Sequence, residues 1–318
     1  MILITGCAGF IGFHLSKYYL EKNQVILGID NINSYYDKNL KVSRLKILKK
    51  FKNFTFINKD LCNFNEILNI LKNKKVSYII HLAAQPGVRY SYKNPRVTLF
   101  NNLNSFNNII EIARLKKVKK FIYASSSSVY GDVKKFPFRE DDLSIKPISI
   151  YGASKLSNEI IADVYSKNFN LNCFGLRFFT VYGPYGRPDM AYYSFALKNF
   201  NKTMIELYNN AKMLRDFTYV DDVILAISKI VKSKKISNYN HIFNIGKGKP
   251  DKLSDLVKIL QNNFKNKFKI RYKNFIPQGD IKKTYSDNTK IKNFLKWSPE
   301  TSLNSGIKKF AIWFRNFY

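Results

Sequence analysis

Residues 2–30 read ILITGCAGFIGFHLSKYYLEKNQVILGID. An apolar run leads into three glycines spaced GxxGxxG from Gly6, then into a helix-like segment and a second apolar run that ends at Asp30. This order predicts a strand, a glycine turn, a helix and a strand, which is one βαβ unit. The glycine spacing alone is a weak signal, but it gains weight from an acid 18 residues beyond Gly12.

The start of the helix after the glycine turn is expected to bind an anion. Free backbone N–H groups and the positive end of the helix dipole meet there. Glycines let the backbone approach a pyrophosphate, and Asp30 can hydrogen-bond an adenosine ribose. The unit therefore predicts a dinucleotide site, and a glycine turn without a ligand is the alternative interpretation.

The composition is strongly basic, with 54 Lys and Arg against 22 Asp and Glu among 318 residues, a formal net charge of +32. Such an excess often indicates nucleic acid or an anionic membrane as a partner. Here the lysines are scattered among asparagines, and no arginine-rich arm occurs. We therefore expect a solvated basic surface that attracts anionic substrates, with no nucleic-acid partner.

The cysteines and the hydropathy pattern bear on location. Cys7, Cys62 and Cys173 lie far apart without metal-ligand spacing, so we expect reduced thiols and no metal site. Residues 1–16 have no basic start typical of a signal peptide, and the chain has no run of 18 apolar residues. We expect a cytoplasmic protein with no membrane partner.

Strands alternate with helices after the first unit. Further strands are expected at residues 54–57, 78–82 and 121–124, with a helix over about 99–114. This alternation predicts an α/β fold, a Rossmann-type doubly wound parallel sheet covered by helices on both faces. The pattern becomes less regular from about residue 178, where we expect a smaller C-terminal α/β substrate domain.

Two polar features are candidates for chemistry. Tyr151 and Lys155 open an expected helix and share one of its faces, and a nearby ammonium lowers the pKa of a phenol. Residues 125–128 are four serines at a strand end, and alternation along an extended chain predicts Ser126 and Ser128 on one side. The alternatives are a surface Tyr/Lys pair and a generic serine-rich loop.

These motifs resemble the extended short-chain dehydrogenase/reductases, the family of nucleotide-sugar epimerases and dehydratases, and within it most closely the UDP-glucuronate 4-epimerases. The resemblance covers nearly the whole chain. It rests on GCAGFIG at 6–12, GIDN at 28–31 with YYD at 35–37, HLAAQ at 81–85 with GVRYS at 87–91, SVYG at 128–131, the Tyr151/Lys155 pair, LRFFTVYGPYGRPDM at 176–190 and RDFTYVDD at 215–222.

The resemblance implies NAD as the cofactor, because Asp30 would repel the second phosphate of NADP. It implies binding of the cofactor by Gly6, Gly9, Phe10, Ile11, Gly12, Asp30, Asn31, Asp60, Leu61, Leu82, Ala83, Ala84, Gln85, Asn102, Tyr151 and Lys155. Tyr151 would be the base and Lys155 would tune it, while Ser126 would hydrogen-bond the reacting sugar oxygen.

The substrate is expected to be a UDP-sugar. Candidates for the sugar carboxylate are Ser127, Ser128, Thr180 and Arg187, and candidates for the diphosphate are Arg89 and Arg215, with Asp280 nearby. A structural ion pair is the alternative for Arg187. Relatives often have Pro-Gly-Asp where this chain has an additional residue, Gln278.

The expected reaction is 4-epimerisation of UDP-glucuronate through a 4-keto intermediate. Dehydratases and decarboxylases of the family place a Glu in the hydroxyl stretch, where this chain has Ser126-Ser127-Ser128. The alternatives are a 4-epimerase of a neutral UDP-hexose or UDP-N-acetylhexosamine, and a regulatory NAD-binding protein without turnover.

The resemblance also implies an organisation and a context. Residues 1–177, rejoined by about 218–246, would bind NAD, and residues 178–217 and 247–318 would bind the nucleotide sugar. A homodimer formed through helices of the sheet domain and a role in surface polysaccharide synthesis are expected.

Overall fold

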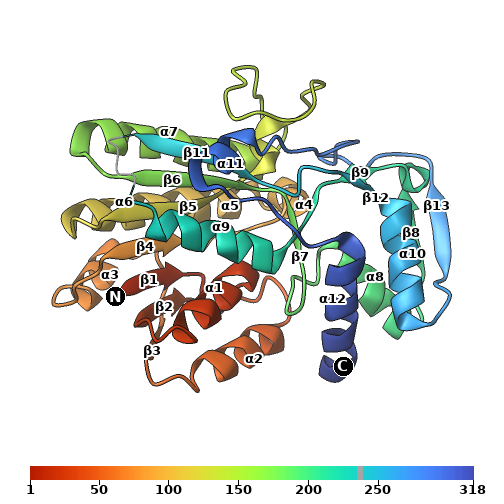
Figure 1. Cartoon of the computed structure of the whole chain (residues 1–318), viewed down its shortest axis with the longest axis horizontal. Helices are drawn as coiled ribbons and strands as arrows, with labels where there is room; N and C mark the ends of the chain where they lie inside the picture. Colours follow the sequence, from red (N-terminus) through yellow and green to blue (C-terminus); the bar gives the residue numbers. More distant parts are fainter. Residues whose placement is uncertain (235–238) are drawn as a thin grey trace.

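The computed structural model, which describes residues 1–234 and 239–318, is organised around a seven-stranded parallel sheet (Figure 1). The strand order is β11-β6-β5-β4-β1-β2-β3. The strands are β1 Ile2–Thr5, β2 Ile26–Asp30, β3 Phe54–Asn58, β4 Tyr78–His81, β5 Lys120–Ser126, β6 Cys173–Phe178 and β11 Asn240–Ile245. The predicted Rossmann-type doubly wound sheet is confirmed.

Helices cover both faces of the sheet, which explains why inner strands such as β1 and β2 are buried at every position. Along β1, Ile2 and Ile4 pack into one buried cluster, while Leu3 packs into the other. One face carries α1 Phe10–Leu20, α2 Lys38–Leu48 and α9 Val220–Lys232, and the opposite face carries α3 Phe64–Ile70, α6 Ser105–Leu115 and α7 Ile150–Phe169.

The direction of the strand order reverses between β1 and β4. From β1 the sheet continues through β2 to β3 on one side, and from β4 through β5 and β6 to β11 on the other. The loops after these two strands touch, since a Cβ on Gly6 would lie 2.8 Å from the Ala83 nitrogen. Ligands of doubly wound sheets bind at such a switch point.

The segment after β4 is more broken than the sequence predicts. In place of one helix over 99–114, α4 Val88–Lys93 and α5 Pro95–Leu99 are followed by a π-helical turn, η1 Phe100–Asn104, which leads into α6. Pro95 stands at the first position of α5, where a missing N–H is harmless. Wide turns of the π type break the 3.6-residue period on which the prediction relied.

A smaller part of the chain lies beside the carboxyl edge of the sheet (Figure 1). Its helices are α8 Ala191–Phe200, α10 Leu253–Phe264 and α12 Leu303–Phe317, with α11 Thr289–Leu295 next to β11. Three strand pairs complete it: β7 Thr180–Tyr182 with β10 Phe217–Tyr219, β9 Leu214–Arg215 with β12 Asp251–Lys252, and β8 Ile205–Tyr208 with β13 Ile270–Lys273.

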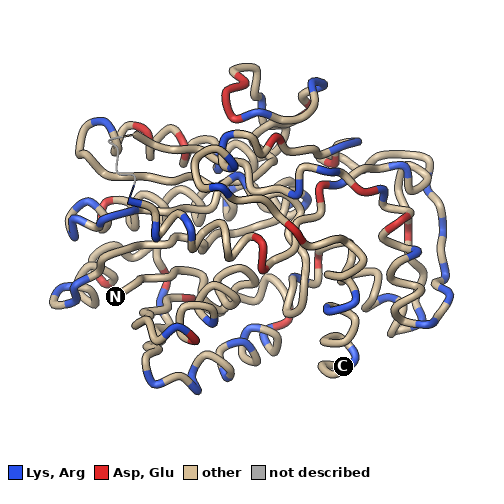
Figure 2. Tube along the Cα trace, in the orientation of Figure 1, with Lys and Arg blue, Asp and Glu red and all other residues tan. Residues whose placement is uncertain are grey.

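The basic residues are spread over helices, strands and loops of the whole chain (Figure 2). Within residues 1–234 and 239–318, no helix is both long and apolar enough to cross a membrane. The same residues contain no cluster of three metal-ligating side chains. Cys7, Cys62 and Cys173 are all free thiols.

Candidate active site

A cavity of about 730 Å³ lies at the carboxyl edge of the sheet, where the sheet meets the smaller part of the chain. It brings together residues that are far apart in the sequence. Of the residues predicted from sequence, its lining contains Gly6, Gly9, Phe10, Ile11, Gly12, Asp30, Asn31, Asp60, Leu61, Leu82, Ala83, Ala84, Gln85, Arg89, Ser126, Ser127, Ser128, Tyr151, Lys155, Thr180, Arg187, Arg215 and Asp280.

The glycine turn forms one wall of this cavity. Gly6 adopts φ +69°, and its carbonyl accepts a hydrogen bond from Gly9 N at 2.9 Å. A Cβ on Gly12 would lie 2.1 Å from the Gly6 carbonyl oxygen, so only glycine fits there. Gly9 caps α1 without a side-chain hydrogen bond, which leaves the first N–H groups of the helix available to an anion.

One carboxylate at the end of β2 and one just after β3 lie on the same wall. Asp30 is buried, and its two oxygens accept hydrogen bonds from the backbone N–H groups of Ala8 (3.1 Å) and Ile32 (2.9 Å). Asn31 donates its side-chain amide to Asp60 at 3.0 Å. Asp30 therefore lies on the cavity wall beside the glycine turn, held there by two backbone N–H groups.

Asn102 is the predicted site residue that is not among the lining residues of the cavity. It is buried in η1, where its side chain accepts from Gln85 N (2.7 Å) and donates to Gln85 O (3.1 Å) and Ser154 Oγ (3.0 Å). The structure thus places Asn102 behind the wall as a support for Gln85. The widened π turn carries it there instead of into the cavity.

Tyr151 and Lys155 lie on the first turns of α7 and face the cavity together, as predicted. Ser149 caps the helix by accepting a hydrogen bond from Gly152 N, which fixes where the four-residue spacing begins. Lys155 is buried, its Nζ donates to the Ala124 carbonyl at 3.0 Å, and it lies 6.0 Å from the centre of the Tyr151 ring.

The pKa of Tyr151 departs from the expectation. Burial raises it above the usual 10.0, while the charge of Arg187 and a hydrogen bond with Ser126 act in the opposite direction. Burial also lowers the pKa of Lys155 to about 8. The predicted lowering by Lys155 is therefore wrong for the protein alone, because desolvation of the phenolate outweighs the neighbouring charges.

The serine stretch does not continue as an extended chain. β5 ends at Ser126, and Ser127–Tyr130 form a single 3₁₀ turn, η2. Ser126 Oγ accepts from Ser128 N at 3.1 Å and contacts Ser128 Oγ at 3.2 Å. The predicted alternation along an extended chain is therefore wrong, but the turn still places Ser126, Ser127 and Ser128 together on the cavity wall.

Arg187 enters the cavity from the loop after β7 and is paired there. Its Nε and Nη2 bind the two carboxylate oxygens of Asp189 at 3.0 and 2.5 Å, and Tyr35 donates its hydroxyl to Asp189 at 3.1 Å. The ion pair considered as an alternative is present. Arg187 nevertheless lines the cavity and is close enough to affect Tyr151.

The far end of the cavity gathers two arginines and an acid. Arg89 Nη2 binds Asp280 at 2.7 Å, and its guanidinium lies 5.3 Å from the centre of the Tyr208 ring. Arg215 donates to the Leu214 carbonyl at 2.9 Å, and burial lowers its pKa. The longer loop at Gln278 thus still delivers Asp280 to this end.

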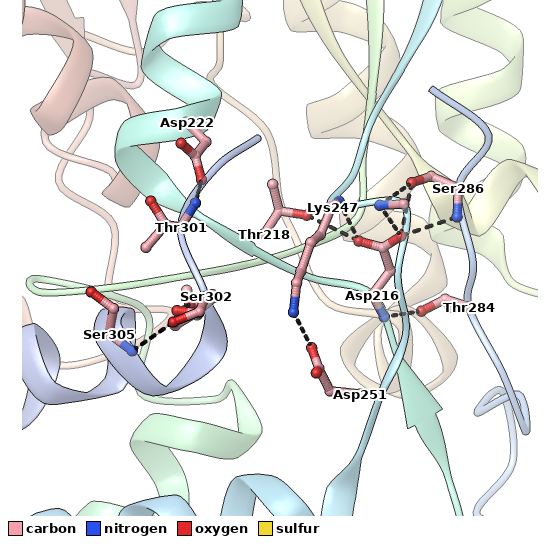
Figure 3. Close-up of polar contacts among 12 residues, drawn as sticks. Asp216, Thr218, Asp222, Lys247, Asp251, Thr284, Ser286, Thr301, Ser302 and Ser305 are labelled. Atoms are coloured by element: carbon pink, nitrogen blue, oxygen red, sulfur yellow. Dashed lines mark hydrogen bonds and ion pairs between the residues drawn. The ribbon is translucent and has the colours of Figure 1, made fainter. Parts of the chain in front are cut away.

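Asp216, next to Arg215, is fully buried and holds three segments together (Figure 3). Its carboxylate accepts hydrogen bonds from the backbone of Lys247 and Gly248, from Ser286 N and Oγ, and from Thr218 Oγ1. Its own backbone N–H donates to Thr284, and its carbonyl accepts from Thr180 N. This network fixes the backbone that carries Thr180 and Arg215 into the cavity.

Sequence reasoning missed Tyr35, Asp189 and Asp216. Two signals were available: Asp189 follows Arg187 by two residues, and Asp216 stands beside Arg215 among the apolar residues Met213, Leu214, Phe217 and Tyr219. A buried acid of that kind needs several donors, which indicates a structural anchor.

The doubly wound sheet, the glycine turn before α1 and the Tyr151/Lys155 pair on α7 define an extended short-chain dehydrogenase/reductase. The family model described as GDP-mannose 4,6 dehydratase matches residues 3–310. The chain belongs to this family, and the resemblance predicted from sequence is confirmed.

Individual relatives match over almost their whole length. Protein CapI of Staphylococcus aureus is 40% identical over 100% of this chain and 99% of its own. The UDP-glucuronate 4-epimerase of Thermodesulfobacterium geofontis is 38% identical over 98% of this chain and 95% of its own.

Solved structures also match over almost the whole length of this chain. The UDP-glucuronic acid 4-epimerase of Bacillus cereus, in complex with UDP-glucuronic acid and NAD, has a TM-score of 0.91 and 32% identity, covering 100% of this chain and 99% of its own. The UDP-glucose 4-epimerase of Thermotoga maritima, with UDP-glucose, has a TM-score of 0.90 and 30% identity, covering 99% of both chains.

Asp216→Asn is expected to lower the free energy of unfolding by roughly 3 kcal/mol, because the new amide N–H₂ group faces backbone N–H donors in a buried site. Asp222→Asn is the matched control. Asp222 is also buried, and its carboxylate accepts a hydrogen bond from Thr301 N, so a loss of about 1 kcal/mol is expected. Urea unfolding followed by circular dichroism measures both, and equal losses would contradict the anchoring role.

Proposed function

We propose that this protein is an NAD-dependent enzyme that interconverts UDP-glucuronate and UDP-galacturonate by 4-epimerisation. The observation that carries the proposal is the composition of the cavity wall around Tyr151. Three serine hydroxyls stand where eliminating or decarboxylating relatives carry an acid, and Arg187 reaches the same cavity with a fork suited to a carboxylate.

The residues of the glycine turn fit a dinucleotide. The turn has no room for a Cβ at Gly12. The start of α1 has no side-chain cap and can bind an anion, and Asp30 stands at the end of β2. These features accommodate a pyrophosphate and an adenosine ribose. The structural neighbours hold NAD, and the relatives named as epimerases are enzymes, which agrees with the predicted cofactor and enzyme class.

Bound NAD supplies a reversible acceptor for the hydride on C4 of the sugar. The hydrogen on C4 is not acidic, since C4 lies beyond the carbon next to the carboxylate, so inversion requires oxidation there. Tyr151 takes the proton of the C4 hydroxyl when the sugar is oxidised and returns it after the 4-keto sugar has turned over. Ser126 holds the same oxygen, and its hydrogen bond and the charge of Arg187 both favour the phenolate of Tyr151.

We assign the two ends of the substrate to the two ends of the cavity. Arg89 and Arg215 provide positive charge for the diphosphate, with Asp280 fixing Arg89. Ser127, Ser128, Thr180 and Arg187 provide donors for the sugar carboxylate. These roles agree with the scattered basic surface, which attracts an anionic substrate.

A neutral UDP-hexose or UDP-N-acetylhexosamine is the second candidate, and one observation favours it. Asp189 occupies two donors of Arg187 in the structure, so a uronate has to share or replace that contact. A neutral sugar would leave the pair intact. The relative from Thermotoga maritima shows that the same fold accepts UDP-glucose.

The assignment is tested by incubating the purified protein separately with UDP-glucuronate, UDP-glucose and UDP-N-acetylglucosamine and resolving the products by NMR. We expect UDP-galacturonate from the first and little product from the others. Tyr151→Phe is the control, expected to retain bound NAD and lose turnover. Conversion of the neutral sugars alone would exclude the uronate assignment.

Arg187→Ala is expected to lower kcat/KM for the uronate roughly 10- to 100-fold, the range for one charged hydrogen-bond partner. A smaller loss is expected with a neutral sugar.

The same variant is expected to change the pH dependence of the reaction. Removing the positive charge of Arg187 raises the pKa of Tyr151, so the rise of kcat with pH moves to higher pH with the uronate and with the neutral sugar. Arg139→Ala is the matched control, because Arg139 forms the same fork with Asp141 on the surface. Equal losses for both sugars would argue against a carboxylate contact.

We also propose the division of the chain expected from sequence. Residues 1–177 with 218–246 form the cofactor part, supported by the pairing of β11 with β6, and residues 178–217 and 247–318 form the substrate part. Of these, residues 235–238 lie outside the described residues. A cytoplasmic enzyme that supplies UDP-galacturonate to surface polysaccharide agrees with the three free thiols.

A homodimer is proposed from an exposed apolar face on α5, η1 and α7. Val97, Phe100, Ile160 and Val164 are between 44% and 59% exposed, and α5 and η1 both contact α7. Phe100→Asp is expected to give a monomer in light scattering at micromolar concentration. Leu143→Asp is the control, because Leu143 is exposed outside this face. A dimer that persists in Phe100→Asp places the interface elsewhere.

A further inference from the structure

Three consecutive main-chain carbonyls directly before Arg187 accept hydrogen bonds from side chains of the sheet domain. His14 on α1 lies 2.9 Å from the Pro184 carbonyl oxygen through Nε2. Arg44 on α2 donates through Nη2 to the carbonyls of Tyr185 at 2.7 Å and Gly186 at 2.9 Å. Residues 184–187, called here the Arg187 segment, are thus held from the cofactor side of the molecule.

Arg44 also contacts the glycine turn. Its Nη1 donates to the Ala8 carbonyl at 2.7 Å and to the Tyr36 hydroxyl at 2.6 Å. Ala8 lies between Gly6 and Gly9, and its N–H donates to Asp30. One guanidinium therefore joins the proposed ribose and pyrophosphate site to the segment that carries Arg187.

The burial of Arg44 makes these contacts costly to lose. The side chain is fully buried, and within the described residues its hydrogen bonds go to carbonyl and hydroxyl oxygens. A buried charge held by neutral acceptors depends on each of them. Arg44 is not among the residues that line the cavity.

The Arg187 segment has a backbone that needs external support. Tyr185 adopts φ +53°, which is unfavourable for a side chain of its size, and its ring packs on Phe13 and Trp313. Burial lowers the pKa of His14 to about 4, so its imidazole is neutral at pH 7 and its Nε2–H donates to the Pro184 carbonyl.

We propose that Arg44, assisted by His14, is a positioning residue that holds the Arg187 segment in register with the glycine turn. The sugar carboxylate is thereby fixed relative to Tyr151 and the cofactor. This inference rests on the proposed function, because it assigns to Arg187 a contact with the substrate. A change of register on the order of 1 Å between reacting groups costs about 100-fold in rate.

The test is a double-mutant cycle of kcat/KM between Arg44→Met and Arg187→Ala, measured with UDP-glucuronate on NAD-loaded protein. Arg44→Met alone is expected to lower kcat/KM about 10- to 100-fold. The double variant is expected to lose little more than the larger single loss, because Arg44 acts through Arg187. Independent losses that multiply would overturn the proposal.

Binding provides a readout that does not depend on turnover. In a Tyr151→Phe background, calorimetry compares UDP-glucuronate with UDP alone. Arg44→Met is expected to reduce the affinity gained from the glucuronate group, as Arg187→Ala does, and to leave the affinity for UDP unchanged. An equal loss of affinity for both ligands would also overturn the proposal, since it indicates general damage to the fold.

Lys120→Met is the matched control. Lys120 is likewise a buried cation that donates to main-chain carbonyls, those of Ile230 and Ser233, but it does not line the cavity. Lys120→Met is expected to lower the melting temperature. Any loss of kcat/KM that it causes is expected to multiply with the loss caused by Arg187→Ala. If Arg44→Met does not fold, His14→Leu takes its place in the same cycle, with the same two outcomes.

Different results would overturn the proposed function and the positioning role of Arg44. Absence of UDP-glucuronate turnover by the unmodified protein removes the proposed function. In that case the cycle is measured with whichever UDP-sugar the protein converts, and multiplicative losses there still overturn the positioning role.

Discussion

All strands of the central sheet run parallel, so their carboxyl ends meet at one edge, and the functional groups of the protein depend on this constraint. Gly6, Asp30, Ala83 and Ser126 stand at or just after the ends of four different strands, yet they line one cavity. The reversal of strand order between β1 and β4 opens the edge at that point. The smaller part of the chain then has only to cover the opening with Arg187, Arg215 and their neighbours.

Burial sets the electrostatics of this edge. Desolvation raises the pKa of Tyr151 and lowers that of Lys155 to about 8, so the two pKa values, which are nearly equal in water, move apart and the phenol holds its proton more tightly than the ammonium does. Positive charge from Arg187 opposes the shift of Tyr151. Under the proposed function, the guanidinium that recognises the sugar carboxylate would therefore also adjust the pKa of the base.

The sequence predicts the sheet, the glycine turn and the Tyr151/Lys155 pair because these depend on local periodicity and on spacing along single elements. Resemblance to a family adds residues such as Arg89 and Asp280, which no periodicity could bring together. Predictions failed where a turn replaced an extended chain, as at Ser127–Tyr130, or where a π turn left Asn102 buried behind the cavity wall. The burial of Arg44 could not be predicted from the sequence, because Arg44 lies in a basic helix and such helices are typical of a solvent-exposed surface.

Asp216 anchors the segment around Thr284 and Ser286, and this anchor affects where the length of the chain can vary. The loop that includes Gln278 begins at β13, which pairs with β8, and ends at this anchor, so both of its ends are fixed independently of its length. An added residue such as Gln278 is absorbed within the loop. The loop next to the proposed diphosphate site can therefore be remodelled during evolution, or exchanged by loop grafting, without disturbing the backbone around Tyr151.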